Sequence, residues 1–430
     1  TALLGTGPVT VNSGATLALN RTALANSVTL NNATVTAGNS FGSTLSGPVT
    51  LSGISTISVS GNLAIAGNIT GAGGLTKTLG STVPVTGINT YSGPTTISAG
   101  ALKFKSSLYG NDTAKWIPAN ITVASGAALV LNVGGAGEFT IAQAGSLFAQ
   151  LVTGVNSNGL KAGSQIGVDT SGAGAAAVTT YSATLADSTG SGGGAVGIKH
   201  FGVGTLELTG ANTYSGVSIT DGNGTLRVSS LNSVNGGSPP LATSSLGRPT
   251  TIANGTIWLE TSTTFQGGNL TYTGTGETTD RVLNLGGANS TTYRLDQSGS
   301  GLLKFTGGFT ITDNRGPKTI VLQGSTAGRG EMASVIPNGD AANPNRLTKS
   351  GTGAWTLDGV NDYTGATLVS GGVLACASAA ALGSGPLTIN GGKLQLDFFG
   401  TRQVSSLTLG STVQPNGTYA FDGTYDPAIG

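Results

Sequence analysis

Cysteine and histidine are almost absent from this sequence of 430 residues, which holds only Cys376 and His200. One cysteine excludes an internal disulfide and a cysteine zinc cluster. One histidine gives no support to a zinc site built on paired histidines or to a nucleophile triad. We therefore expect no metal and no cofactor. Cys376 follows GVLA at an inward-type position, and we expect it to be a small core residue.

Charge is also scarce, since charged residues make up 9% of the chain and the formal net charge is +1. No cluster of Lys or Arg offers a surface for nucleic acid or for an anionic membrane. No apolar run approaches the roughly 20 residues of a membrane span. The first residues, TALLGTGPVT, lack the layout of a signal peptide. We expect no nucleic-acid partner, no direct membrane insertion, and a processed or excised form if the protein is exported.

Glycine is abundant, with 73 residues, whereas aromatic residues reach only 5%. Such a composition can belong to a disordered chain. However, apolar residues alternate with small polar ones in VTVNSGATLAL, GTLELTG and LTINGGKLQLDF. This period of two, interrupted by Gly and Asn, is typical of β-strands joined by turns. We expect a folded, all-β chain with a narrow core.

Three cassettes repeat along the chain and align without a gap. They read LTKTLGSTVPVTGINTYSG from Leu75, IKHFGVGTLELTGANTYSG from Ile198 and LTKSGTGAWTLDGVNDYTG from Leu347. A finer period lies within them, because GTLEL at Gly204 is followed by GTLRV at Gly224. The step between these two positions is about the length of one coil of a β-solenoid.

Strand geometry then predicts a stacked core. If Leu206 and Leu208 point inward, Leu226 and Val228 lie directly above them one coil later, at the ~4.8 Å spacing of neighbouring strands. Glycine and asparagine supply the positive φ angles that sharp corners need. The expected fold is therefore a single-stranded parallel β-helix, a β-solenoid with coils of about 20 residues and irregular loop insertions.

The cassettes at 75–104, 198–228 and 347–396 resemble the autotransporter-associated β-strand repeat, whose units look like LTKxGxGxLxLxGxNxYxGxTxxxxGxLxL. The middle cassette carries His200 where the others carry Lys77 and Lys349. The tail QVSSLTLGSTVQPNGTYAFDGTY resembles the closing segment of such proteins. The resemblance implies a right-handed parallel β-helix, extracellular or on the surface of a bacterial cell. The membrane barrel that normally follows is not recognisable, so we expect that it was removed or that export used another route.

We expect residues 1–430 to form one continuous solenoid of about 20 coils, roughly 95 Å long at the strand spacing. The coil period fails at 152–197, 229–246 and 312–346, which we expect to be loop insertions or irregular coils. Any host, glycan or matrix partner is expected to bind there.

The repeated turn supplies the candidate site residues, and we expect a structural role for them. The tyrosines could stack on sugar rings, but they lie roughly 30 Å apart by the strand spacing and cannot form one pocket. The asparagines are expected to form Asx-turns. The nine residues are Asn89, Tyr91, Gly93, Asn212, Tyr214, Gly216, Asn361, Tyr363 and Gly365.

Other candidates for chemistry are weak, and we expect no catalytic residue. Asp358 and Asp362 form the best carboxylate pair for glycoside chemistry, but the other cassettes carry threonine at both matching positions. The glycine-rich stretches at 133–139 and 188–197 do not sit between a strand and a helix, so phosphate binding is not supported.

Two function classes remain open, and a third is distant. The first is a non-enzymatic stalk or the subunit of an extracellular filament, because neither end of the chain shows a helical or charged cap and open strand edges promote end-to-end pairing. The second is an adhesin or carbohydrate-binding surface protein. The third is a polysaccharide-degrading enzyme, for which charges along one face are too sparse.

Overall fold

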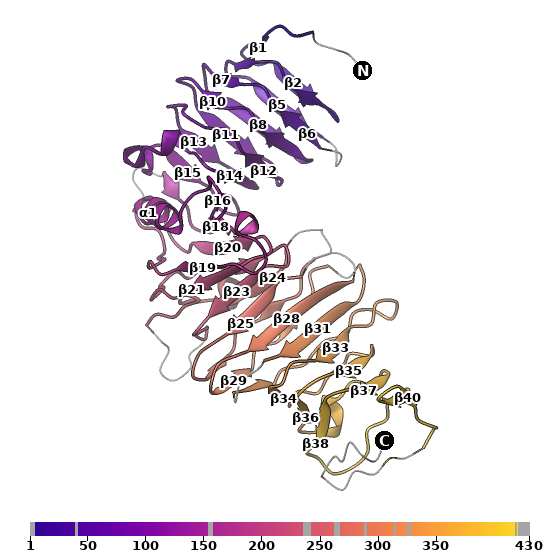
Figure 1. Cartoon of the computed structure of the whole chain (residues 1–430). Coiled ribbons are helices and arrows are strands. Elements are labelled where there is room, and N and C mark those ends of the chain that lie inside the picture. Colours follow the sequence, from indigo (N-terminus) through magenta and orange to yellow (C-terminus); the bar gives the residue numbers. More distant parts are fainter. Residues whose placement is uncertain are drawn as a thin grey trace. The chain divides into compact units, whose positions relative to one another are not determined.

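The computed structural model describes residues 5–38, 42–153, 158–234, 242–261, 267–287, 290–313, 315–324, 328–417 and 419. The chain divides into two compact units. Unit 1 comprises Thr1–Gly204 and Tyr214–Gly216, and unit 2 comprises Thr205–Thr213 and Val217–Gly430. Both units are stacks of short strands (Figure 1). The end of the tail that resembles a closing segment lies outside the described residues.

In unit 1, three sheets form the walls of the stack. The first has the order β1 (Val9–Val11), β4 (Val28–Leu30), β7 (Val49–Leu51), β10 (Ile69–Thr70). The second has the order β17 (Gly159–Leu160), β15 (Ile121–Val123), β13 (Thr95–Ile97), β11 (Leu75–Thr78), β8 (Ser55–Val59), β5 (Thr34–Ala37), β2 (Thr16–Leu19). The third contains, in order, β3 (Ala23–Leu24), β6 (Ser43–Leu45), β9 (Leu63–Ile65), β12 (Thr82–Val85), β14 (Ala101–Phe104), β16 (Ala128–Asn132), β18 (Gln165–Asp169), β20 (Gly197–Phe201).

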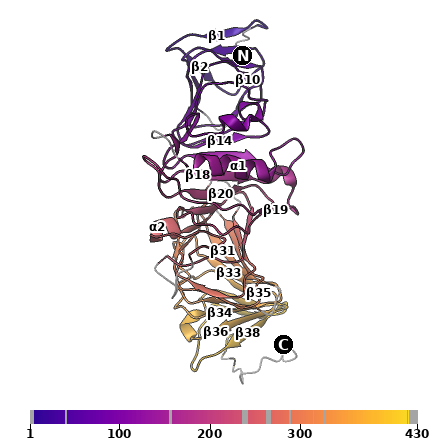
Figure 2. The ribbon, with the colours of Figure 1, turned by 90° about the vertical axis from the view of Figure 1, so that its left-hand side faces the viewer.

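Helical segments interrupt the coils of unit 1. The longest is α1 (Ile141–Leu151), which follows β16 and contacts β19 (Val178–Tyr181). Thr140 and Gln143 form a capping box at its start, and Leu147 and Phe148 are buried. Figure 2 shows α1 on the side of this unit that faces the viewer. The short 3-10 helices are η1 (Tyr109–Asn111), η2 (Thr113–Lys115) and η3 (Ser171–Ala173).

Unit 2 repeats the architecture with three sets of strands. One set has the order β21 (Thr205–Leu208), β23 (Thr225–Val228), β25 (Asn269–Tyr272), β28 (Thr291–Gln297), β31 (Lys318–Gln323), β33 (Arg346–Lys349), β35 (Thr367–Val369), β37 (Leu387–Ile389), β39 (Leu407–Leu409), β40 (Thr412–Val413). Another has the order β26 (Glu277–Thr279), β29 (Leu302–Phe305), β32 (Arg329–Met332), β34 (Ala354–Leu357), β36 (Val373–Cys376), β38 (Lys393–Leu396). The third contains β22 (Ser218–Thr220), β24 (Ile257–Leu259), β27 (Leu283–Asn284) and β30 (Phe309–Thr310), while α2 (Ile252–Gly255) and η4 (Ala379–Ala381) lie between strands.

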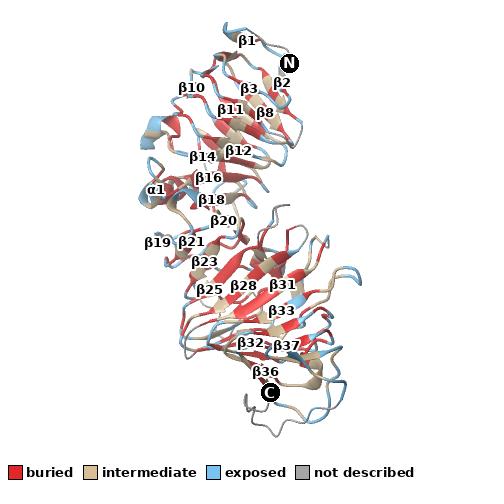
Figure 3. Cartoon of the chain, turned by 45° about the vertical axis from the view of Figure 1, so that its right-hand side comes forward, coloured by how far each residue is buried: buried red, intermediate tan, exposed pale blue. Residues whose placement is uncertain are grey.

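The expected stacking of apolar residues is confirmed. In the parallel pair β21 and β23, Leu206 lies opposite Leu226 and Leu208 lies opposite Val228, and all four side chains are buried. Burial alternates along single strands, as in β28, and Figure 3 shows the buried residues in red along β25, β28 and β31. Each coil thus pairs its backbone with the next while its inward side chains fill a thin core, which is a parallel β-solenoid.

Coil length stays close to the predicted period in the first coils of unit 1 and in the cassettes. Thr56 of β8, Thr76 of β11 and Thr96 of β13 are aligned across the sheet and follow one another at equal steps of that period. The next aligned residue, Thr122 of β15, comes later in the chain than such a step would place it. In unit 2, strands β23 and β25 pair directly although the whole segment 229–268 lies between them. The longer coils contain the insertions.

The predicted insertions hold more regular structure than we expected. The segment 152–197 contains β17, β18 and β19, and the segment 312–346 contains β31 and β32. The described residues of 229–246 contain no strand. Some charged residues of 312–346 lie in these regular coils. Lys318 is buried, and Glu331 lies 2.6 Å from Lys304 Nζ in the register-paired strand β29.

One strand edge that we expected to be open is covered. The two-residue strand β40 pairs antiparallel with β39, with Thr408 opposite Val413. The other described pairs of named strands are parallel. Strand β38 stands last in its own set. A β-hairpin, which is neither helical nor charged, therefore caps one of the stacked sheets, and the expectation of an uncapped end is wrong for this sheet.

Candidate functional site

The repeated asparagine joins neighbouring coils. The Nδ2 of Asn89 donates to the carbonyl oxygens of Gly87 at 2.8 Å and of Ser107 at 2.9 Å. Asn361 donates from Nδ2 to the carbonyl of Ala381 and accepts the N–H of Ile336 at 2.7 Å. The interpretation as Asx-turn formers is wrong for these two residues. Asn89 Oδ1 accepts no hydrogen bond within the described residues, and Asn361 Oδ1 accepts from Ile336 of another coil instead of from its own turn.

The third asparagine makes the same kind of contact. Asn212 is buried and donates from Nδ2 to the carbonyl oxygen of Ser245 at 2.7 Å. In all three cassettes the amide thus satisfies a buried carbonyl of another coil. The side chain acts as a clamp between coils.

The repeated tyrosines are buried and cannot stack on sugars. Tyr91, Tyr214 and Tyr363 are at most 1% exposed. The hydroxyl of Tyr91 lies 2.6 Å from Thr95 Oγ1, which lies 2.8 Å from the hydroxyl of Tyr109. Burial raises the pKa of Tyr363 to about 12. These rings are part of the packed interior of the coils.

The repeated glycines are required by close approach of two coils. A Cβ on Gly93 would lie 2.4 Å from the carbonyl carbon of Gly73, and one on Gly365 would lie 2.3 Å from the carbonyl oxygen of Asn345. A Cβ on Gly216 would lie 2.4 Å from the carbonyl carbon of Val196. None of the three has a positive φ. Our expectation that glycine serves mainly to allow positive φ does not hold at this turn.

The lysine of the cassette is buried, which the sequence analysis missed. Lys77 lies inward in β11, and its Nζ is 2.7 Å from the carbonyl oxygens of Thr78 and Leu79. Lys349 donates in the same way to Ser350 at 2.6 Å and to Gly371, in the next coil, at 3.1 Å. Burial lowers the pKa of each lysine to about 8. Strand alternation was a usable signal, because Leu75, two residues before Lys77, is an inward residue.

His200 occupies the lysine position of the middle cassette. It is buried in β20 opposite Val168, and its Nε2 lies 2.9 Å from Thr170 Oγ1. It is therefore part of the coil packing. Cys376 is fully buried in β36, as expected, and burial raises the pKa of its thiol to about 12. A thiol in this state is a poor nucleophile.

The carboxylate pair lies at the surface. Asp358 and Asp362 are both exposed, and their backbone N–H groups donate to the carbonyls of Met332 and Ile336. Asp358 lies close enough to Lys304 to help raise the pKa of that lysine, although the hydrogen bond to Glu331 is the larger cause. Asp358 thus belongs to a surface charge cluster with Lys304 and Glu331.

The glycine-rich stretches are closed by their own hydrogen bonds. In 133–139, the Glu138 carboxylate accepts the backbone N–H of Gly135 at 2.9 Å. In 188–197, the Ser188 hydroxyl accepts the N–H of Gly194 at 3.1 Å. The Glu138 carboxylate thus occupies the backbone N–H of Gly135, which an anion would otherwise bind. The hydrogen bond closes the first stretch into a turn. The ground on which we set phosphate binding aside is wrong for the first stretch, because 133–139 does lie between strand β16 and helix α1.

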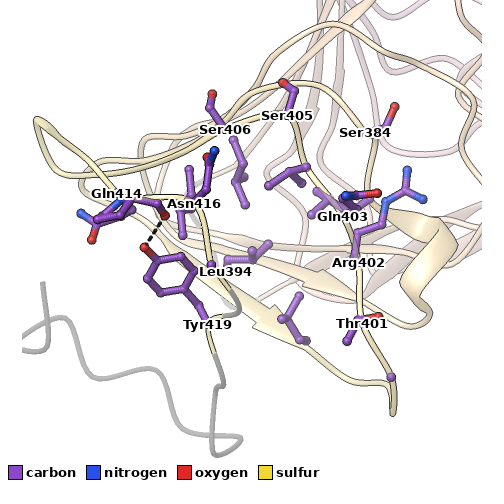
Figure 4. Close-up of a pocket in the computed structure, with 18 of the residues that line it drawn as sticks. Ser384, Leu394, Thr401, Arg402, Gln403, Ser405, Ser406, Gln414, Asn416 and Tyr419 are labelled. Atoms are coloured by element: carbon purple, nitrogen blue, oxygen red, sulfur yellow. Dashed lines mark hydrogen bonds between the residues drawn. The ribbon is translucent and has the colours of Figure 1, made fainter.

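One cavity of about 1110 Å³ lies where the core of unit 2 opens beyond β37 and β38. Its apolar lining includes Leu387, Leu394 and Leu407, and its polar lining includes Arg402 and Gln403 (Figure 4). The hydroxyl of Tyr419 donates to the carbonyl of Pro415 at its edge. Nε of Arg402 is buried and makes no hydrogen bond within the described part of the chain.

Neither a metal cluster nor a membrane span is found in the described residues. No group of three or more His, Cys, Asp or Glu side chains there could hold a metal ion. No helix there is both long and apolar enough to cross a membrane.

Comparison with known proteins identifies the repeats. Residues 70–104, 201–228 and 347–375 match the family described as passenger-associated-transport-repeat. The adhesin BmaC autotransporter of Brucella suis biovar 1 (strain 1330) is 39% identical over 118 residues, which is 27% of this chain and 3% of that relative. No solved structure matches. The repeat resemblance is confirmed, and the chain is an extracellular or cell-surface protein that carries these repeats.

Proposed function

We propose that this chain is a rigid, non-enzymatic segment of a bacterial surface passenger and that it takes part in adhesion. The observation that carries the proposal is the solenoid with its inter-coil clamps. Backbone ladders join each coil to the next, and Asn89, Lys77 and their counterparts add side-chain bonds between coils. Such a stack resists bending and can present a binding surface away from a cell. The adhesin name of the similar autotransporter agrees with this role.

The proposed partner surface is the set of helical excursions in unit 1. Most of the solenoid wall is made of paired strands, whereas α1 lies outside the strands and presents its own side chains to solvent. Ala142, Ser146 and Ala149 are exposed on this helix, while Leu147 and Phe148 anchor it. A loop or helix fixed on a rigid scaffold is a common location for binding residues. Host surface proteins, glycans and matrix proteins are the partner classes to test.

Surface display tests the adhesion proposal. The whole chain is displayed on non-adherent bacteria, and bound cells are counted on host cells, on matrix-coated plates and on immobilised glycans. We expect adhesion above that of bacteria without the displayed chain, and its loss when Ser146 and Ala149 are both replaced by arginine. A control with Ala366→Arg, an exposed position in unit 2, should keep adhesion. Absence of adhesion to every surface would reject the proposal.

A second candidate function is a subunit that stacks end to end into filaments. Among the described strands, β38 is the last of its set, so its outer edge has backbone groups that a second copy could pair with, although β40 covers β39. Negative-stain electron microscopy at several concentrations tests this function. Filaments of uniform width would support it, and isolated particles at the highest concentration would reject it.

The proposal that the chain is not an enzyme has its own test. Purified chain is incubated with a panel of polysaccharides, and new reducing ends are measured. We expect no turnover. Turnover that disappears in Asp358→Ala would overturn this part of the proposal.

A further inference from the structure

The inward side chains of unit 2 lose their cover in its last coil. Val369 and Ile389 are at most 2% exposed, but Leu409, the next residue of the same register row, is only partly buried. In the neighbouring sheet, Cys376 is fully buried, whereas its register partner Leu396 is only partly buried. Leu396 lines the cavity of about 1110 Å³. The apolar core therefore reaches solvent at this end of the described chain.

Exposed aromatic side chains lie at the same end. Phe399 is fully exposed and Tyr419 is 39% exposed, whereas the other aromatic residues of the described chain are buried or partly buried. Phe399 follows β38, and Tyr419 lines the cavity (Figure 4). Val413 of β40 is exposed as well. Single exposed apolar residues are normal on a protein surface, but a group of them beside an apolar cavity indicates a contact surface.

The cavity also contains a positive charge that lacks an acceptor. Arg402 lines it, and its buried Nε makes no hydrogen bond within the described residues. Burial raises the pKa of the Cys376 thiol to about 12, and the charge of Arg402 partly opposes this rise, so the guanidinium lies close to the core. The nearest acidic residue in the sequence, Asp397, accepts the Nε2 of Gln395 at 2.9 Å. A buried N–H group without an acceptor is costly, so this position favours a carboxylate.

The sequence that follows the last described residue has the complementary chemistry. That residue is Tyr419, whose hydroxyl donates to the carbonyl oxygen of Pro415 at 2.7 Å at the edge of the cavity. The next stretch, residues 420–430, reads AFDGTYDPAIG. It begins beside the cavity and, fully extended, can span about 36 Å. It holds three bulky side chains and two carboxylates but no basic residue, and these five residues are Phe421, Tyr425, Ile429, Asp422 and Asp426.

We propose that residues 420–430 cover the open end of the core and that one of their aspartate carboxylates binds Arg402. We call these residues the covering segment. Its bulky side chains pack against the apolar lining of the cavity, which includes Leu387, Leu394 and Leu407, because this contact removes both surfaces from water. The carboxylate supplies the acceptor that the buried guanidinium lacks. This inference is independent of adhesion to a host, and a covered end opposes the stacking of a second copy there.

Thiol labelling of the full chain tests the proposal. Phe421→Cys and Ile429→Cys are made separately, so that each variant keeps the other bulky side chains of the covering segment. We expect each new thiol to react at least about tenfold more slowly than that of Ala366→Cys, an exposed position, because a covered site reacts only when it opens. The native Cys376 is buried and contributes little background. Labelling of both new thiols at the rate of Ala366→Cys would overturn the proposal.

Charge variants, combined with Phe421→Cys, test the contact with Arg402. Labelling should become faster in Arg402→Gln and in Asp422→Asn with Asp426→Asn, because each change removes the ion pair. Arg346→Gln, at an exposed arginine of β33, is the matched control and should leave labelling slow.

Two further results would contradict the proposal. Slow labelling that persists in both charge variants would show that Arg402 does not hold the covering segment. Protection that appears only as the protein concentration rises would assign the cavity to a second copy of the chain. Circular dichroism checks that each variant is folded, and if Arg402→Gln fails to fold, the aspartate variant decides alone.

Discussion

Asn89 and Ser107 bond to each other through both backbone and side chain, although they belong to different coils. The Nδ2 of Asn89 donates to the Ser107 carbonyl oxygen at 2.9 Å, and the Asn89 backbone N–H donates to Ser107 Oγ at 3.1 Å. Both residues are buried. A turn that looks local in the sequence is thus a point where two coils are fastened together.

Replacing this asparagine should lower stability. Asn89→Ala leaves the Ser107 carbonyl oxygen without its side-chain donor in a buried site, which costs about 1–3 kcal/mol. We expect a lower Tm in thermal unfolding followed by circular dichroism. Asn12→Ala is the control, because Asn12 is exposed, and it should leave Tm nearly unchanged. Equal Tm values for wild type and Asn89→Ala would contradict the clamp.

Adding one methyl group to a repeated glycine should lower stability more than removing the asparagine side chain. In Gly93→Ala the new Cβ would collide with the backbone of Gly73, and backbone cannot move aside cheaply. We expect a loss of about 2 kcal/mol or more, seen as a lower Tm or as insoluble protein.

The matched control for this prediction is Gly80→Ala. A Cβ there meets nothing within 4 Å, and Gly80 has no positive φ. Its Tm should stay near that of wild type or rise slightly. If both alanine variants melted alike, close approach could not be the reason for glycine in the repeat.

The buried lysines should make the stability of the folded chain vary with pH in the alkaline range. Burial lowers the folded-state pKa of Lys77 and Lys349 from 10.5 to about 8. Between about pH 8 and 10.5 the unfolded chain therefore holds protons that the folded chain has released. Raising the pH through this window stabilises the folded state through these two groups.

A difference measurement isolates the lysine contribution from the ionisation of tyrosines. Tm is recorded from neutral pH up to the ordinary lysine pKa for wild type and for Lys77→Met with Lys349→Met. We expect the Tm of wild type to rise relative to that of the variant as the pH increases. A constant difference across the window would show that the lysines do not titrate there.

Cys376 should be unreactive while the protein is folded. Its thiol is buried, and its pKa of about 12 leaves little thiolate at mildly alkaline pH. A thiol reagent under those conditions should label it only after denaturation. Ala366→Cys adds an exposed thiol as an internal control, which should react at once in the folded state. Rapid labelling of wild type would show that the core of this coil opens.

Periodicity was sufficient to predict the architecture of the coils. The step from Leu206 to Leu226 is a register pair in the structure, and the alternation of Cys376 with its neighbours correctly predicted its burial. The helix α1 was missed, although Thr140 and Gln143 form a capping box before an apolar run. Lys77 was missed because lysine is rarely buried, even though strand alternation points it inward.

The alternation of inward and outward side chains within each strand can be predicted from the sequence, because successive side chains of any extended chain point to opposite faces. The sequence by itself therefore determined the β class, the inward residues and the three repeated cassettes. Lateral alignment between strands followed from the sequence where the coil period is regular, as for Leu206 and Leu226. Where coil length varies, it was decided only by the tertiary structure. The outward threonines of the second sheet of unit 1 show the reason. They lie opposite one another in register but are unevenly spaced along the chain, at Thr16, Thr34, Thr56, Thr76, Thr96 and Thr122. Corners and insertions absorb these differences in length, and only the folded coils bring the six hydroxyl groups into one row.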